Sequence, residues 1–144
     1  MVQLNQKPPS PEVSTVLNLP VHLLPDYTGW LIERMHQKLG THVVTLNAEM
    51  AILTEKEQNL AQIIKNAELV VPDGAGIIFY LLLRGKRQKR SPGIELAESL
   101  LYRLGQLSQP PLVCFYGGTP ETAAIAATVW QKKLPELPLS LIHI

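Results

Sequence analysis

The chain has 144 residues, 13 lysines and arginines against 12 aspartates and glutamates, and a formal net charge of +1. A hydrophobic content of 46% is enough for a packed core, and the near-neutral charge excludes a polycation that binds nucleic acid by bulk charge alone. The single cysteine excludes a disulfide framework and a cysteine-rich metal site. The longest uncharged apolar run, residues 76–83, is shorter than the ~20 residues that span a bilayer. The N-terminus lacks the apolar core of a signal peptide, which predicts a cytoplasmic location.

The first half of the chain predicts a leader followed by alternating helices and strands. Residues 1–14 contain three prolines among polar residues and are predicted to form a flexible leader. Apolar residues at 31, 35 and 39 share one helical face, and Asp26 or Thr28 could cap the start of that helix. The β-branched run 42–46 predicts a strand, and residues 54–57 match a capping box that opens a helix.

The second half continues the alternation. The predicted elements are a buried strand at 69–71, a buried helix at 74–83, a basic loop at 84–92, a helix at 94–107, a buried strand at 112–116, a helix from 119 to about 134, and an extended end from 137. Strands that are apolar throughout and alternate with helices favour an α/β fold with a parallel sheet covered on both faces. In such sheets ligands bind beyond the carboxyl ends of the strands. Chemistry is therefore expected at 45–47, 72–74 and 117–119.

Asp73 is the main catalytic candidate, and two interpretations of it are open. It follows a buried strand and precedes an apolar helix, so it could simply cap that helix. Alternatively, it is a carboxylate held in partly apolar surroundings at the sheet edge, where it could take a proton from a hydroxyl group.

Thr45 and Asn47 are candidates for binding a ligand. They stand two residues apart at the end of a predicted strand, so their side chains point to the same side. The alternative is that they only end the strand and cap the following helix, and the residues alone favour this alternative.

A glycine-containing turn, Gly117, Gly118 and Thr119, joins a predicted strand to a helix that starts at Pro120. Backbone N–H groups at a helix N-terminus can hold a phosphate, although a tight turn between a strand and a helix also uses glycine. The turn matches neither a dinucleotide-binding fingerprint nor a Walker A loop.

The segment from Arg84 to Arg90 has five cations in seven residues. Such a run is usually a solvated loop. It could also bind nucleic acid, a pyrophosphate or an anionic bilayer surface, although no aromatic residue within it could stack on bases. The four histidines lack metal-ligand spacing, so no zinc site is predicted.

Four segments together carry a resemblance to a known family: VVTLNAEM (43–50), AELVVPDGAG (67–76), RSPGIEL (90–96) and FYGGTPE (115–121). In order and spacing they resemble the WecG/TagA/CpsF glycosyltransferases, from about Val16 to about Leu139. Members of that family add N-acetylmannosamine-type sugars to an acceptor linked to polyprenyl diphosphate. The resemblance implies an α/β fold with a parallel Rossmann-like sheet and helices on both faces, truncated at the C-terminus.

The resemblance also implies roles for individual residues in an inverting transfer from a UDP-sugar. Asp73 matches the family's general base. Thr45 and Asn47, with Gly74 beside the base, match the sugar-binding pocket, and Arg90 is expected to clamp a diphosphate. The turn formed by Gly117, Gly118 and Thr119 is expected near the nucleotide.

The resemblance further implies neither a metal nor another cofactor, and no nucleic-acid partner. The full-length protein is expected at the inner face of the plasma membrane, attached peripherally through a C-terminal basic region. This sequence departs from the family pattern at Glu95, where aspartate is more frequent.

The resemblance covers a little over half of the family's length. Residues 15–138 are therefore expected to form a partial glycosyltransferase domain, which by itself is poorly active or inactive. The last residues, 139–144, resemble a translated transposase sequencing adaptor, and they are expected to be a non-native tail. Resequencing the locus tests this, because a stop codon directly after Ile144 would contradict it.

One rival from another class is a nonenzymatic nucleotide- or nucleic-acid-binding α/β module that uses the loop 84–90. Salt-dependent retention on a nucleic acid without a response to UDP would favour the module, whereas a thermal shift with UDP would favour the transferase.

Overall fold

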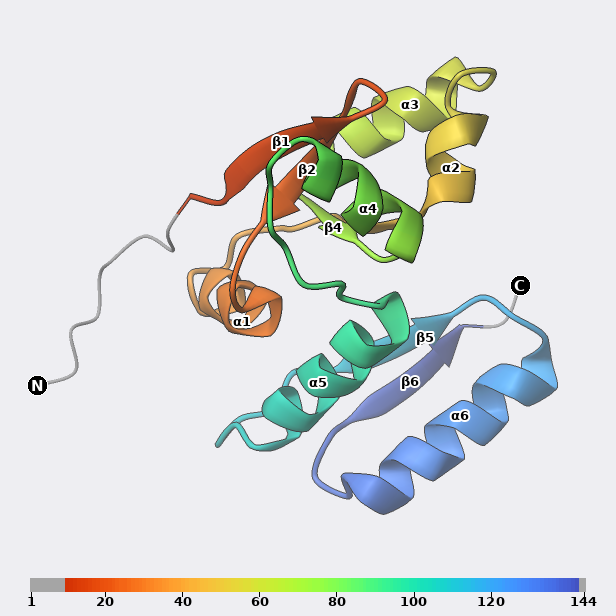
Figure 1. The fold of residues 1–144 in the computed structure, drawn as a ribbon. Helices are drawn as coiled ribbons and strands as arrows, with labels where there is room; N and C mark the ends of the chain where they lie inside the picture. Colours follow the sequence, from red (N-terminus) through yellow and green to blue (C-terminus); the bar gives the residue numbers. More distant parts are fainter. Residues whose placement is uncertain (1–9, 143–144) are drawn as a thin grey trace, which may run out of the picture. The chain divides into compact units, whose positions relative to one another are not determined.

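The computed structural model describes residues 10–142, except for the side chains of Pro120, Leu141 and Ile142 (Figure 1). The chain divides into two compact units, residues 1–97 and 98–144, and each is described here by itself. The elements are β1 (Glu12–Val16), β2 (Leu19–Leu23), α1 (Tyr27–His36), β3 (Val43–Leu46), α2 (Ala48–Leu53), α3 (Gln58–Lys65), β4 (Leu69–Pro72), α4 (Ala75–Leu83), α5 (Gly93–Gly105), β5 (Val113–Tyr116), α6 (Pro120–Lys133) and β6 (Leu139–Ile142).

The first unit opens with an antiparallel hairpin that the sequence analysis did not predict. Strands β1 and β2 pair with Val16 opposite Leu19, and the two turn residues, Leu17 and Asn18, have φ of 47° and 63°. Two consecutive positive φ angles are typical of the type I′ turn, whose twist matches that of a hairpin. Residues 12–14 belong to β1, so the predicted leader extended too far; residues 1–9 lie outside the described part of the chain.

Strands β3 and β4 form a parallel pair, and α2 and α3 lie between them in the chain. All four residues of β4, Leu-Val-Val-Pro, are buried, as expected for a strand covered on both faces. The α/β class and this parallel pairing are confirmed. One continuous parallel sheet is not observed, because the strands of the described residues form three separate two-stranded sheets.

Two clusters of buried side chains flank this pair. One packs β1, β2 and the helices α2 to α4 together, and the other packs α1 and the start of α5 against β4. The first includes Val16, Leu19, Val21, Leu46, Ile64, Val70, Ile77 and Leu81, and the second includes Tyr27, Trp30, Leu69, Val71 and Leu96. Alternate residues of β4 thus contribute to opposite clusters, because successive side chains of a strand point to opposite faces.

Local signals predicted some helix starts and missed others. Asp26 caps α1, and its carboxylate accepts a hydrogen bond from the N–H of Gly29 at 2.8 Å. The capping box at Thr54 is wrong: Thr54 ends α2, is buried, and donates its hydroxyl proton to the carbonyl of Ala51 at 2.7 Å. Helix α3 begins later, at Gln58, without a side-chain cap.

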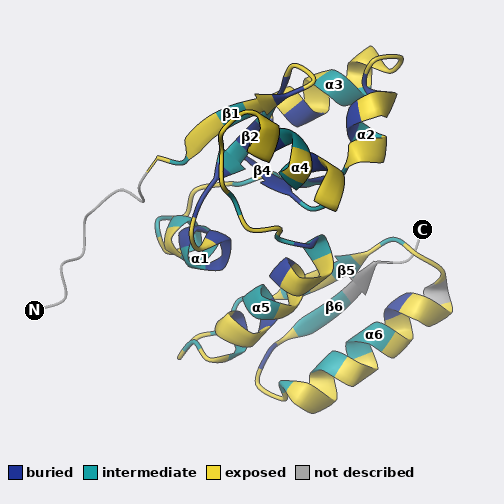
Figure 2. Cartoon of the chain, viewed as in Figure 1, coloured by how far each residue is buried: buried dark blue, intermediate teal, exposed yellow. Residues whose placement is uncertain are grey.

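Helix α4 is not buried all round, contrary to the prediction from its apolar sequence. Ile77 and Leu81 lie in the core, whereas Phe79, Leu82 and Leu83 are 62%, 53% and 72% exposed. Figure 2 shows the exposed residues on this helix and on the loop that follows it. Within residues 10–142, no helix is long and apolar enough to cross a membrane.

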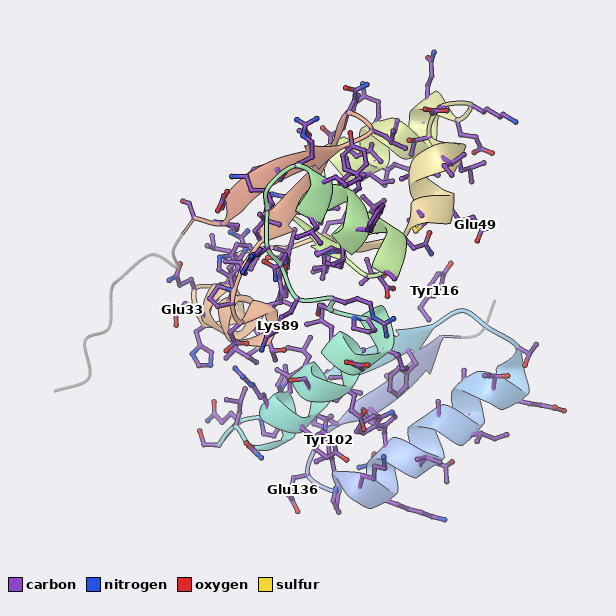
Figure 3. The ribbon with its side chains drawn as sticks, viewed as in Figure 1. Glu33, Glu49, Lys89, Tyr102, Tyr116 and Glu136 are labelled. Carbon is purple, nitrogen blue, oxygen red and sulfur yellow. The ribbon has the colours of Figure 1, made fainter. Side chains whose placement is uncertain are left out.

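The second unit contains the parallel pair β5–β6 together with α6 and most of α5. Helix α6 begins at Pro120, as predicted, and Thr119 caps it. The rings of Tyr102 (labelled in Figure 3) and Trp130 meet edge to face at a centroid distance of 5.4 Å. Residues 139–142, expected to belong to a non-native tail, form β6 and pair with β5.

His22 links the hairpin to the parallel pair. Its Nδ1 accepts a hydrogen bond of 2.8 Å from the backbone N–H of Val70, in β4. Only an unprotonated Nδ1 can accept this bond. Burial lowers the pKa of His22 below its usual value of 6.5, which favours the neutral form in the folded protein.

We expect acid to destabilise the fold through His22. Below about pH 6.5 the unfolded chain binds more protons than the folded chain. The stability that neutral His22 contributes is therefore complete above that pH and is lost as the pH falls through the lowered pKa of the folded state. The variant His22→Asn retains an acceptor at the same position but cannot titrate in this range. Thermal melts between pH 5 and 8 should therefore show a smaller acid-induced fall in Tm for the variant. An identical fall in both proteins would contradict this role.

Candidate functional site

The carboxyl ends of β3 and β4 bring several predicted residues together. Because the strands are parallel and Leu46 pairs with Pro72, both strands end at the same edge. The N–H of Asp73 donates to the carbonyl of Leu46 at 3.0 Å, so the pairing continues beyond β4. The residue after β3, Asn47, and the residue after β4, Asp73, consequently lie next to each other.

The carboxylate of Asp73 is half-buried at this edge. It does not cap α4, because Gly74 occupies the N-cap position and no side chain makes a capping hydrogen bond there. The capping interpretation of Asp73 is therefore wrong. Among residues 10–142 the carboxylate has no hydrogen-bond or ion-pair partner, so its acceptor capacity is available to a ligand.

The side chain of Asn47 caps a helix and can also bind a ligand. Its Oδ1 accepts a hydrogen bond of 2.8 Å from the N–H of Met50, so it caps α2, as the capping alternative predicted. The two N–H groups of the same amide remain as donors. Gly74 lies against this side chain, since a Cβ built on the glycine would be 3.5 Å from the Cβ of Asn47.

Thr45 lies within β3, half-buried, and does not cap α2, so the capping alternative fails for this residue. A Cβ built on Gly93 would be 3.0 Å from both Oγ1 and Cγ2 of Thr45, which means that the first residue of α5 lies directly on this side chain. The N–H of Ser91 donates to the carbonyl of Pro72 at 3.0 Å. The segment 91–93 is thereby attached to the ends of both strands.

Gly93 was not among the residues predicted for the site. The signal for it was present, because Gly93 stands three residues after Arg90 in RSPGIEL (90–96), one of the segments that carry the family resemblance. Arg90 itself has an exposed side chain and directly precedes Ser91, whose backbone is hydrogen-bonded to β4. The hydrogen bond from Ser91 to Pro72 brings the backbone of Arg90 to the edge, whereas the side chain of Arg90 extends into solvent.

The predicted nucleotide-binding turn belongs to the second unit. Gly117 and Gly118 have φ of 100° and 69°, a region that strongly favours glycine. Thr119 accepts a hydrogen bond from the N–H of Thr122 at 3.3 Å. The turn thus has the strand-to-helix geometry expected of it.

The edge in the first unit offers hydrogen-bonding groups and one carboxylate. Across the described part of the chain, no three histidine, cysteine, aspartate or glutamate side chains are grouped so that they could hold a metal ion. The chemistry that this arrangement supports is proton acceptance at Asp73 beside neutral donors at Asn47 and Thr45.

Comparison with known proteins extends this description. A model of the glycosyl transferase WecG/TagA/CpsF family matches residues 14–143. An N-acetylglucosaminyldiphosphoundecaprenol N-acetyl-beta-D-mannosaminyltransferase of Bacillus spizizenii is 30% identical over 91 residues, which are 62% of this chain and 35% of the relative. The aligned part thus spans about a third of that relative's length.

We expect Gly93→Ala to disturb the site, because its methyl group would be forced against Thr45. Thr45 is β-branched and held in a strand, so it cannot readily turn away. Overpacking of this kind costs about 1–3 kcal/mol, more than the helix propensity gained by replacing glycine with alanine. Urea denaturation should show the loss as a lower midpoint concentration.

The matched control is Gly40→Ala, since a Cβ on Gly40 would meet nothing within 4 Å. This control should unfold at an unchanged or slightly higher urea concentration. Equal stability in the two variants would show that Gly93 does not pack against Thr45 in this way.

Proposed function

Because the chain belongs to the WecG/TagA/CpsF family of glycosyl transferases, we propose that it forms the part of the active site that contains the general base of such an enzyme. The reaction we propose moves an N-acetylmannosamine-type sugar from UDP to an acceptor linked to polyprenyl diphosphate. The name of the Bacillus spizizenii relative, an N-acetylmannosaminyltransferase that acts on a diphosphoundecaprenol-linked sugar, supports this choice of donor sugar and acceptor. The product is a precursor of a cell-surface polysaccharide.

The observation that carries the proposal is the unpartnered, half-buried carboxylate of Asp73 beside Asn47 and Thr45. These residues come from two adjacent parallel strands and meet at the edge where α/β proteins bind ligands. The unit β3–α2–α3–β4 is the building block of a Rossmann-like sheet, which is the finer fold that we propose for this chain.

The proposed step is a single displacement with inversion. The acceptor hydroxyl oxygen forms a bond to the anomeric carbon while the bond from that carbon to the UDP oxygen breaks. Asp73 accepts the hydroxyl proton, and UDP leaves with the electron pair of the broken bond. The free amide N–H groups of Asn47 and the hydroxyl of Thr45 orient the sugar by hydrogen bonds.

Charge on the departing diphosphate requires stabilisation by cations and helix N-termini. We propose that Arg90 supplies a guanidinium for this purpose, since its side chain is exposed and its neighbour is attached to β4. We also propose that the turn 117–119 binds nucleotide phosphate through its backbone N–H groups at the N-terminus of α6.

We expect Asp73→Asn to abolish transfer while leaving donor binding intact. The amide has nearly the same shape as the carboxylate but cannot accept the proton, and loss of a general base typically lowers the rate by about 10²–10⁴-fold. Transfer should be measured by mass spectrometry with UDP-N-acetylmannosamine and a lipid acceptor, in the complete protein encoded at this locus. UDP binding should be measured by calorimetry.

The control is Glu55→Gln, which removes an exposed carboxylate in the turn after α2 and should leave transfer unchanged. Wild-type turnover in Asp73→Asn would remove Asp73 from the base role. Loss of UDP binding together with transfer would instead indicate that the carboxylate shapes the site.

A further inference from the structure

Strand β4 has hydrogen-bond partners on both of its edges. On one edge lies β3, whose last carbonyl accepts from the N–H of Asp73. On the other edge the N–H of Val70 donates to the imidazole of His22, and the carbonyl of Pro72 accepts from the N–H of Ser91. Pro72 has no N–H of its own, so it places no donor without a partner on that edge.

The peptide unit between Pro72 and Asp73 is therefore held at both of its polar groups. Its N–H donates to the carbonyl of Leu46 at 3.0 Å, and its C=O accepts from the N–H of Ser91 at 3.0 Å. The two groups of a trans peptide point in opposite directions, so one bond ties the unit to β3 and the other ties it to the segment 91–93. Because this peptide plane leads into the Cα of Asp73, its orientation limits the directions that the carboxylate can take.

Pro92 restricts the residue that supplies the second of these bonds. A residue that precedes proline is disfavoured in the helical region and favours an extended backbone. Ser91 therefore does not readily join α5, which begins two residues later at Gly93. Its N–H stays outside the helix and reaches the carbonyl of Pro72. An alanine at position 92 would lift the restriction and allow α5 to extend backward, which would turn this N–H away from β4.

The segment is also anchored on the side of α5. Pro92 is buried, and its carbonyl accepts a hydrogen bond of 2.9 Å from the N–H of Leu96. Leu96 is itself buried in one cluster with Leu69 and Val71 of β4. All of these contacts lie within the first unit, so they give the N–H of Ser91 a defined place beside β4.

We propose that Pro92 is a positioning residue for Asp73 and acts through the N–H of Ser91. Pro92 keeps Ser91 extended, Ser91 holds the peptide unit before Asp73, and the carboxylate is thereby aimed at the acceptor hydroxyl. A general base must lie within hydrogen-bond reach of the proton that it accepts, so a small displacement of the carboxylate lowers the rate. This inference rests on the proposed function, in which Asp73 is the base.

The structural part of the proposal is tested on the 144-residue chain, without donor or acceptor. Amide hydrogen exchange, followed by NMR, should be about two- to tenfold faster at Asp73 in Pro92→Ala, since one hydrogen bond is worth about this factor. The amide of Leu69, at the opposite end of β4, donates to the carbonyl of His42 at 3.1 Å and should exchange at an unchanged rate. The matched control Pro25→Ala, at an exposed proline before α1, should change neither amide.

The catalytic part is tested in the complete protein encoded at this locus, with UDP-N-acetylmannosamine and a lipid acceptor. Pro92→Ala should lower kcat by about two- to tenfold and leave the KM for the donor nearly unchanged, because the carboxylate acts on the acceptor proton. Pro92→Gly, which frees the segment further, should lower kcat more. In an Asp73→Asn background, Pro92→Ala should not lower the residual rate further, since it acts through the carboxylate. The control Pro25→Ala should retain the wild-type kcat.

Several outcomes would overturn the proposal. One is an unchanged exchange rate at Asp73 in both Pro92 variants. Another is equal acceleration at Leu69 and Asp73, or an equal fall of the rate with and without Asp73→Asn, because either result would show that Pro92 only stabilises the fold.

The two measurements also separate this proposal from the proposed function. Faster exchange at Asp73 with an unchanged kcat in Pro92→Ala would overturn the positioning role alone and leave Asp73 as the base. Wild-type turnover in Asp73→Asn would overturn the base assignment and the positioning role together. Faster exchange at Asp73 alone, with a lower kcat that depends on the carboxylate, would support both.

Discussion

The parallel pairing of β3 with β4 is the constraint on which the candidate site depends. The register aligns Leu46 with Pro72, and the hydrogen bond from the N–H of Asp73 to the carbonyl of Leu46 extends it past the strand ends. Backbone groups away from water must find partners, and this bond keeps the residues that follow the two strands next to each other. A slip of one residue would turn Thr45 to the opposite face and separate Asn47 from Asp73.

The same edge determines how α4 begins and therefore what its outer face presents. Gly74 occupies the N-cap and leaves the Asp73 carboxylate without a capping role. The helix then packs Ile77 and Leu81 inward, which necessarily turns Phe79 outward.

The sequence was most informative where one physical demand dominated. Residues 69–72 are an uninterrupted apolar run, and such a run has few alternatives to a strand buried on both faces. The hairpin was missed because its turn uses Leu17 and Asn18 where a glycine would be the usual signal. Thr54 matched a capping pattern, yet its hydroxyl donates a hydrogen bond to the carbonyl of Ala51 in the preceding helix, α2. Tertiary packing, which the local pattern does not contain, determines this bond. The fold also determines that Gly93 lies against Thr45. The sequence could indicate the segment 90–96 as part of the site, but it could not indicate this contact.

We propose that the edge formed by residues 45–47, 73–74 and 90–93 receives the UDP-sugar. Its most direct test is a titration of the isotopically labelled chain with UDP-sugar, followed by heteronuclear NMR of the backbone amides. We expect saturable shifts at these residues and none at Lys56, an exposed position in the turn between α2 and α3. Shifts confined to residues 84–89, or no shifts at saturating ligand, would contradict this assignment.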